Sequence, residues 1–314
     1  NTFETRQPNG MKVVVREDHR APTAVQMVWY RVGSMDEHDG VTGVAHVTEH
    51  MMFKGTPSVG PGEFNRRVAA VGGRDNAFTS TDYTAYFQQV PANQLKTVMA
   101  LEADRMRHLT LDPAGYSKEI QVVMEERRMR TDDQSTARLH EAMNAVAWQA
   151  HPYRRPIIGW MGDLEQMTVQ DIRDWYRRWY VPNNATLVVV GDVNHAQVFA
   201  WARDTYGRIP ARSLGERKQY EEPVQTGLRQ LEVKAPADLP LLIMGWKAPR
   251  VSDPQKDIDP YALEMLAQIL DGHEGARLPA ALVREQQVAV SVDASYDAMN
   301  RGPGMFFLQA SPRP

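Results

Sequence analysis

The pentapeptide His46-Val47-Thr48-Glu49-His50, a His-x-x-Glu-His motif, constrains this chain more than any other stretch. Histidines four residues apart share one face of an α-helix, so one metal ion can bind both imidazoles if the segment is helical. Glu49 would then lie close enough to accept a proton from a metal-bound water. The motif therefore predicts a helix that carries a metal site, and a metallopeptidase is the first hypothesis.

The motif has an alternative interpretation, in which His46 and His50 are core histidines of an amphipathic helix. The apolar stripe of that helix would consist of Val44, Val47, Met51 and Met52. Burying two histidines and a carboxylate together without a metal ion is costly in free energy. This cost favours the metal site.

A third protein ligand is expected from a helix predicted over Lys118 to Arg130, with Ser117 as its cap. Glu119 and Glu126 are seven residues apart (126 − 119 = 7) and share a face of this helix, whereas Glu125 points about 100° away from Glu126. A ligand and a carboxylate that orients a ligating histidine should share a face, so Glu126 is the expected ligand and Glu119 the orienting residue. The arginines of this helix are expected on a solvated face: Arg127, Arg128 and Arg130.

Several spaced motifs together resemble the pitrilysin/insulinase family of inverted-motif zinc peptidases. They are the His46–His50 pentapeptide, the run Met51-Met52-Phe53-Lys54-Gly55-Thr56, Gly72-Gly73, Asn76-Ala77-Phe78-Thr79, Glu119 and Glu126. Glu126 follows His50 by 76 residues (126 − 50 = 76), as in that family's third ligand. The resemblance is to the shorter bacterial and mitochondrial-processing-peptidase-like members, whose active unit is a pair of separate subunits.

The resemblance implies one zinc ion, held by His46, His50 and Glu126, and a peptide substrate that adds to the edge of a sheet. The strand from Asn76 to Ser80 matches that edge, and main-chain pairing there would fix the register of the substrate. Asn76 and Ala77 would contact the substrate through their backbone. Phe53 and Phe78 are expected to line an apolar side-chain pocket.

The predicted elements give an α+β fold, because strands and helices are segregated without regular βαβ alternation. Residues 1–206 are expected to form the zinc-binding domain, 207–226 a linker and 227–314 a second domain without metal ligands, with strands near 231–233 and 241–246. The resemblance implies that both domains share one α/β-sandwich-like fold. With 88 residues (314 − 226 = 88), the second domain is expected to be truncated, and the family's C-terminal substrate-binding Arg and Tyr would lie beyond Pro314.

Composition excludes several other classes of protein. The formal net charge is −3, with 36 basic and 39 acidic side chains, so no basic field indicates nucleic-acid binding. No apolar run approaches the roughly 20 residues of a membrane span. The absence of cysteine leaves His, Asp and Glu as the strong metal-binding side chains.

The sequence therefore predicts a zinc-dependent endopeptidase that hydrolyses peptides or unfolded segments, with Glu49 activating a zinc-bound water and Glu119 supporting catalysis. The alternative is a non-catalytic structural subunit, like the core subunits of the respiratory cytochrome bc complex, which share the fold. The expected partner is a related subunit without the zinc motif, or a second copy of the chain. The compartment is not specified, although the bacterial periplasm is favoured over the cytoplasm.

Overall fold

The chain divides into two compact units in a computed structural model, which describes residues 1–217 and 219–313. Unit 1 consists of Asn1–Arg128 and Arg155–Glu221, and unit 2 of Met129–Arg154 and Glu222–Pro314. Residues 129–154 thus belong to the unit that also contains the C-terminal part, whereas the sequence had suggested a continuous first domain up to residue 206. The limits of 1–206, 207–226 and 227–314 stay a prediction.

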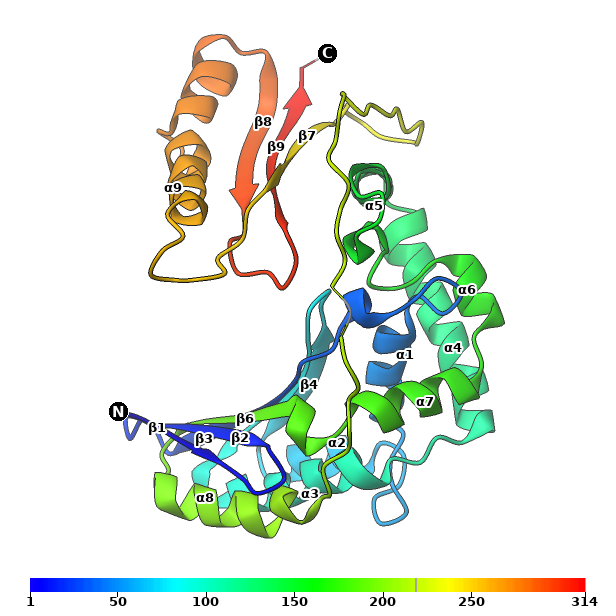
Figure 1. Cartoon of the computed structure of the whole chain (residues 1–314), viewed down its shortest axis with the longest axis vertical. Coiled ribbons are helices and arrows are strands. Elements are labelled where there is room, and N and C mark those ends of the chain that lie inside the picture. The colour runs from blue at the N-terminus through cyan, green and yellow to red at the C-terminus, as the bar shows by residue number, and fades with distance from the viewer. Residues whose placement is uncertain (218, 314) are drawn as a thin grey trace. The chain divides into compact units, whose positions relative to one another are not determined.

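Unit 1 is built on a six-stranded mixed sheet with the order β1-β2-β6-β3-β5-β4 (Figure 1). Its strands are β1 (Thr2–Arg6), β2 (Lys12–Glu17), β3 (Thr23–Tyr30), β4 (Arg74–Thr79), β5 (Thr84–Pro91) and β6 (Ala185–Gly191). All pairs are antiparallel except β2 with β6, which is parallel. β4 is the last strand in this order, so among the described residues its outer edge has no neighbouring strand.

The helices of unit 1 bury one face of this sheet. They are α1 (Val44–Met51), α2 (Glu63–Ala70), α3 (Leu95–His108), α4 (Pro113–Arg127), α6 (Met161–Gln166), α7 (Val169–Trp179) and α8 (His195–Asp204). In β3, Ala24, Val28 and Tyr30 are buried among them, while the alternate residues are only partly buried, as expected for a strand with one covered face. Among the described residues, none of the helices combines the length and the apolar character that a membrane span requires.

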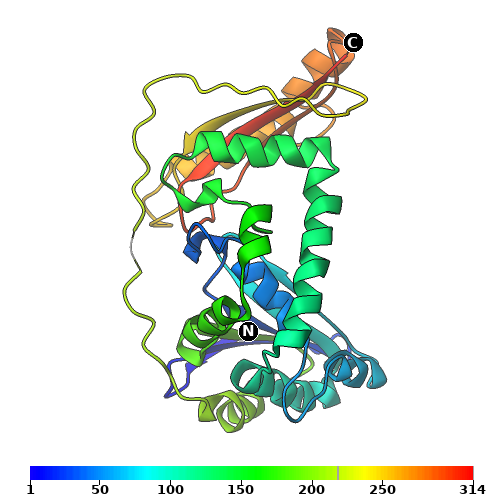
Figure 2. The same ribbon diagram turned by 90° about the vertical axis from the view of Figure 1, so that its right-hand side faces the viewer.

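Unit 2 has a three-stranded antiparallel sheet with a helix on each face (Figures 1 and 2). Its elements are α5 (Ser135–Ala147), β7 (Leu242–Ala248), α9 (Asp259–Asp271), β8 (Ala289–Tyr296) and β9 (Gly304–Pro312). Alternate residues of β9 face opposite helices: Met305 and Phe307 pack in the cluster with Met143 of α5, and Phe306 and Leu308 pack in the cluster with Ala267 of α9.

Short helical turns connect these elements in both units. They are the 3₁₀ helices η1 (Ser34–Asp36), η2 (Ala92–Gln94), η4 (Pro152–Arg154), η5 (Pro182–Asn184) and η6 (Tyr206–Arg208), and the π-helical segments η3 (Arg128–Asp132) and η7 (Pro279–Glu285).

The two units repeat one motif. In unit 1 the chain runs β3-α1-α2-β4-β5 with the sheet order β3-β5-β4, and in unit 2 it runs β7-α9-η7-β8-β9 with the sheet order β7-β9-β8. This confirms the predicted α+β fold and its second, related copy. Among the described residues, unit 2 has no counterparts of β1, β2 and β6, so its copy of the fold is incomplete.

The strand predicted near 231–233 is wrong. In unit 1 the strand that precedes β3 is β2, which is bonded to β1 on one side and to β6 on the other. Residues 231–233 precede β7 in the same way and show alternating exposure, but the described chain forms no ladder with them. A strand needs a bonded neighbour, and the neighbours that hold β2 have no counterparts here.

The metal-motif helix α1 begins at a position that only glycine tolerates well. Gly43 precedes the helix with φ = 90°, and a Cβ on this residue would lie 2.5 Å from the carbonyl oxygen of Ile158. The buried side chain of Glu37 caps the helix, because its two carboxylate oxygens accept hydrogen bonds from the backbone N–H groups of Gly43 and Ala45, each at 2.9 Å. These contacts set the start of the helix and thus the face that carries the histidines.

Candidate metal centre

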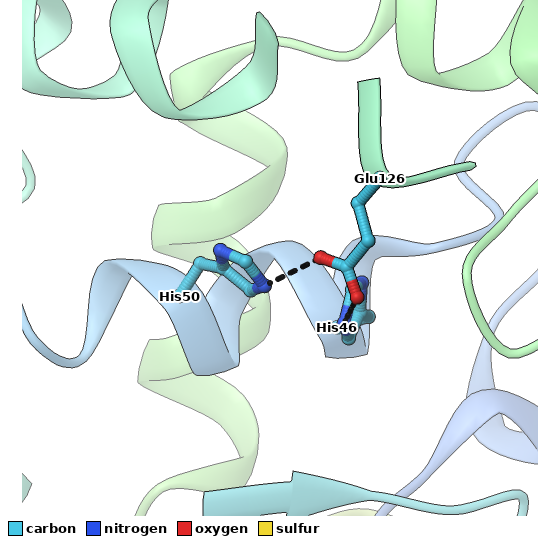
Figure 3. A group of neighbouring side chains, drawn as sticks. All are labelled: His46, His50 and Glu126. Atoms are coloured by element: carbon cyan, nitrogen blue, oxygen red, sulfur yellow. Dashed lines mark ion pairs between the residues drawn. The ribbon is translucent and has the colours of Figure 1, made fainter. Parts of the chain in front are cut away.

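Two histidines from α1 and one glutamate from α4 converge in unit 1. His50 Nε2 lies 3.3 Å from Glu126 Oε2, and His46 Nε2 lies 3.8 Å from Glu126 Oε1 (Figure 3). One ligand atom from each of the three residues can be chosen so that all lie within 4.8 Å of one another. The helical spacing of the histidines, predicted from the pentapeptide, is what brings both rings to the same carboxylate.

The donor set suits zinc. Two neutral imidazoles and one carboxylate are a common three-ligand set of catalytic zinc sites, which keep a fourth position open, and imidazole is a poor ligand for Mg²⁺ or Ca²⁺. The three side chains are largely buried, with exposed fractions of 12% for His46, 20% for His50 and 15% for Glu126. Among the described residues they form the one group of three or more His, Cys, Asp or Glu side chains that is close enough to hold a metal ion.

Glu119 lies behind His50 and is hydrogen-bonded to its ring. His50 Nδ1 donates to Glu119 Oε1 at 2.9 Å, which leaves Nε2 as the nitrogen that faces Glu126. Lys54 pairs with the other carboxylate oxygen of Glu119. Burial disfavours the charged form of both side chains, but their partners outweigh it. The hydrogen bonds from His50 and Lys54 lower the pKa of Glu119. The hydrogen bond to Glu119 and the nearby carboxylates of Glu126 and Glu49 raise the pKa of His50.

Glu49 extends from the same helix and reaches the sheet. It accepts at Oε2 a hydrogen bond from the hydroxyl of Thr79, the last residue of β4. The proposed general base is therefore attached both to the helix that carries the histidines and to the edge strand. Its neighbour His50 belongs to the metal group, so the Glu49 carboxylate and the two histidines come from one turn of α1.

Asn76 and Ala77, predicted to bind substrate through their backbone, lie in the edge strand β4. On the side of β5 their partners are Phe87 and Tyr86. On the other side no strand of the described chain adjoins them. An extended peptide can add to such an edge by main-chain hydrogen bonding.

The two phenylalanines predicted to line one pocket have separate neighbours. The ring of Phe53 lies 6.3 Å from that of Tyr86, and the ring of Phe78 lies 5.6 Å from that of Trp29 and 6.1 Å from that of Tyr83. Tyr86 is on the helix-covered face of the sheet, whereas the pleat directs Phe78 to the other face, with Ala85 as its cross-strand partner. The structure therefore does not bring Phe53 and Phe78 together.

Sequence reasoning missed three side chains that support this site: Glu37, Lys54 and Thr79. Lys54 and Thr79 stand inside the motif runs quoted above, so their positions carried a signal, but their partners are distant in sequence. Arg127 was expected in solvent and is instead buried, donating to the carbonyl oxygen of Gly159 at 2.8 Å. The sequence pattern alone cannot show which of Arg127, Arg128 and Arg130 is buried.

The comparisons with known proteins agree with this geometry. Residues 12–160 match the family model described as insulinase (peptidase family M16), and residues 166–314 match the model of the M16 inactive domain. A solved structure of a protease from Helicobacter pylori is 31% identical with a TM-score of 0.93, covering 100% of this chain and 75% of that one. The chain belongs to the insulinase family, M16. The resemblance inferred from the motifs is thus confirmed.

Relatives of this M16 chain are named as zinc proteases. The chain is 34% identical over 287 residues to the zinc protease PqqE of Helicobacter pylori, and this alignment covers 90% of the chain and 63% of PqqE. The structure of the periplasmic protease PqqL from Escherichia coli has a TM-score of 0.82 at 24% identity over 99% of this chain and 35% of that one, a likeness of fold. The chain thus spans less than two thirds of PqqE.

Proposed function

We propose that this chain is the zinc-binding part of an endopeptidase that hydrolyses peptides or unfolded segments. The observation that carries the proposal is the convergence of His46, His50 and Glu126 beside Glu49, in a member of a family whose relatives are named zinc proteases. A zinc ion held by these three side chains would polarise the peptide carbonyl and lower the pKa of a water molecule.

Glu49 acts in this proposal as general base and then as general acid. Its carboxylate takes a proton from the attacking water and afterwards returns a proton to the nitrogen of the leaving amine. Its place next to His50 on α1 supports this role, because a base must lie within hydrogen-bonding distance of the proton that it removes. Glu119 keeps the ring of His50 oriented and takes no part in proton transfer to the substrate.

The substrate is proposed to add as an extended strand to the outer edge of β4, with Asn76 and Ala77 supplying main-chain groups. The position of β4 at the end of the sheet supports this mode, as does the link from its last residue, Thr79, to Glu49. Main-chain pairing fixes register without demanding a particular sequence. Because Phe53 and Phe78 have separate neighbours, each is proposed to contact substrate side chains by itself, without forming one shared pocket.

The working enzyme is proposed to be a dimer, formed with a related subunit without the zinc motif or with a second copy. The two subunits would enclose a chamber that admits peptides and excludes folded proteins, and closure would remove water from the site. Size-exclusion chromatography with peptide hydrolysis assayed across the fractions tests this. Full specific activity in a monomer peak would refute it. The bacterial periplasm is the proposed compartment, because PqqL, which has a similar fold, is a periplasmic protease, and cell fractionation with an antibody checks it.

The experiment that tests the proposed function is hydrolysis of a quenched fluorescent peptide library, measured with the zinc content of the same sample. Activity that depends on bound zinc supports the endopeptidase. Stoichiometric zinc without any hydrolysis would favour the alternative, a structural subunit of a processing-peptidase-like or core-protein-like complex. The complete set of His46, Glu49, His50 and Glu126 supports the enzyme, because catalysis needs all four.

A further inference from the structure

The hydroxyl of Thr79, the last residue of β4, donates a hydrogen bond to the carboxylate of Glu49 on the metal-motif helix. Both side chains are partly buried. Thr79 alternates with Ala77 along β4, and Ala77 packs against the core that includes α1 residues, so Thr79 points to the α1 side of the sheet. The contact therefore lies on the same face of the sheet as the metal group.

A glutamate needs such an anchor if it is to act as a base. Its carboxylate stands on several rotatable bonds, whose last torsion has a broad, shallow preference. A hydroxyl that donates to one carboxylate oxygen fixes that torsion and keeps the carboxylate an acceptor. A shift of about 1 Å in a reacting group costs about 100-fold in rate, so a loose base would be a poor one.

The anchor is on the strand that is proposed to receive the substrate. The backbone of Thr79 pairs with Thr84 of β5, so its position is set by the sheet and not by a loop. A peptide that pairs with β4 would take its register from the same strand that holds Glu49. The distance between the scissile bond and the base would then be determined by one rigid element.

We infer that Thr79 is a positioning residue for Glu49, fixing the carboxylate relative to a substrate strand bound at β4. This inference rests on the proposed function, because it names a determinant of turnover at the same site. It assigns Thr79 no contact with the metal ion and no proton transfer.

The test compares two substitutions, Thr79→Val and Thr79→Ser. Valine keeps the shape of threonine and removes the hydroxyl, whereas serine keeps the hydroxyl. Thr79→Val is expected to lower kcat about 10- to 100-fold with KM and zinc content unchanged, and Thr79→Ser to stay within about threefold of the wild type. Thr186→Val, the same change in β6 of the same sheet, is the matched control and should leave kcat unchanged.

A double variant sharpens the test. If Thr79 acts through Glu49, Thr79→Val should add almost no loss to Glu49→Gln, since interacting residues are not additive. Wild-type kcat in Thr79→Val, or a Thr79→Ser variant as slow as Thr79→Val, would overturn the inference. Loss of zinc in Thr79→Val would also overturn it, by showing a structural role.

A measurement independent of activity separates this inference from the proposed function. A wild-type protein without peptidase activity would refute the proposed function. Crystal structures of Thr79→Val and Thr79→Ser would still decide the positioning. The inference requires the Glu49 carboxylate to turn or to occupy several orientations in Thr79→Val and to keep its wild-type orientation in Thr79→Ser. An unchanged carboxylate in Thr79→Val would refute it.

Discussion

The two units share a strand and helix order but differ in what their equivalent helices carry. α1 follows β3 and presents His46, Glu49 and His50, whereas α9 follows β7 and has no histidine. Among the described residues, the metal-type group lies in unit 1 alone. The repeated fold is thus a scaffold, and the group on α1 is formed only with side chains from α4 and β4.

The supports of the two helices differ as well. α1 begins at Gly43 and is capped by the buried Glu37, whereas Ile258, the N-cap residue of α9, makes no side-chain capping bond. α9 also leaves large apolar side chains exposed, among them Met265 at 61%. The helix that carries the two histidines thus has the better supported N-terminus, as expected for a site that must hold two rings in a defined orientation.

A large loss of turnover is expected from a change on α1 that spares the metal group. Glu49→Gln keeps the size of the side chain but removes its ability to accept a proton, so kcat should fall by about 100- to 10,000-fold while zinc content is unchanged. Glu264→Gln, the corresponding type of change on α9, should leave kcat unchanged. Near-normal turnover in Glu49→Gln would contradict the role of general base.

Removal of a metal ligand should abolish zinc binding and activity together. His46→Ala, His50→Ala and Glu126→Ala each remove one of the three converging donors. Two controls should keep zinc: Glu125→Ala, whose side chain is 61% exposed and paired with Arg128, and His273→Ala in unit 2. Zinc analysis by mass spectrometry checks this, and stoichiometric zinc in Glu126→Ala would show that another residue is the third ligand.

A smaller effect is expected from the residue behind His50. Glu119→Gln removes the charged acceptor at His50 Nδ1 and the partner of Lys54, so zinc affinity or activity should fall about 10- to 100-fold. Competition with a chromophoric chelator measures the affinity. Wild-type affinity and activity together would show that Glu119 does not orient the ring.

The smallest expected effect is on stability and compares the two units directly. Glu37→Gln replaces one of the two accepting oxygens by an NH₂ group that cannot accept a hydrogen bond. The N-terminus of α1 should therefore be less stable by about 1–2 kcal/mol. In unit 2, Glu222 likewise accepts from the backbone N–H groups of Gln149, Ala150 and His151, and Glu222→Gln should destabilise that turn instead. Hydrogen exchange should show each loss in its own unit, and equal losses in both units after either change would contradict their separation.

Much of the site was predictable because its signals are local. His46 and His50 are four residues apart, so a helix alone places them on one face. Glu119 and Glu126 are seven residues apart and share a face, and this spacing distinguished both from Glu125. The start of α4 was misplaced at Ser117, because Asp112 caps the helix and Pro113 opens it. Proline is favoured in the first turn of a helix, so Pro113 is part of α4.

The remaining errors concern contacts between distant segments. The bond from Thr79 to Glu49 spans 30 residues, and the inward turn of Arg127 depends on a carbonyl 32 residues away. No periodicity encodes such partners. The residues near 231–233 have the alternation expected of a strand but no bonded neighbour in the described chain. A segment joins a sheet only if another strand is available to pair with it, so its own sequence does not decide the outcome. The grouping of residues 129–154 with the C-terminal part likewise depends on contacts between distant segments.

The central claim is that the group on α1 and α4 is a zinc centre on which peptide hydrolysis depends. The most direct measurement removes the metal from the purified protein with a chelator, assays peptide hydrolysis, and then adds zinc back in steps while bound zinc is counted. We expect hydrolysis to disappear with the metal and to return in proportion, saturating at about one zinc ion per chain. Undiminished hydrolysis by the metal-free protein, or equal zinc binding by His46→Ala, would contradict the claim.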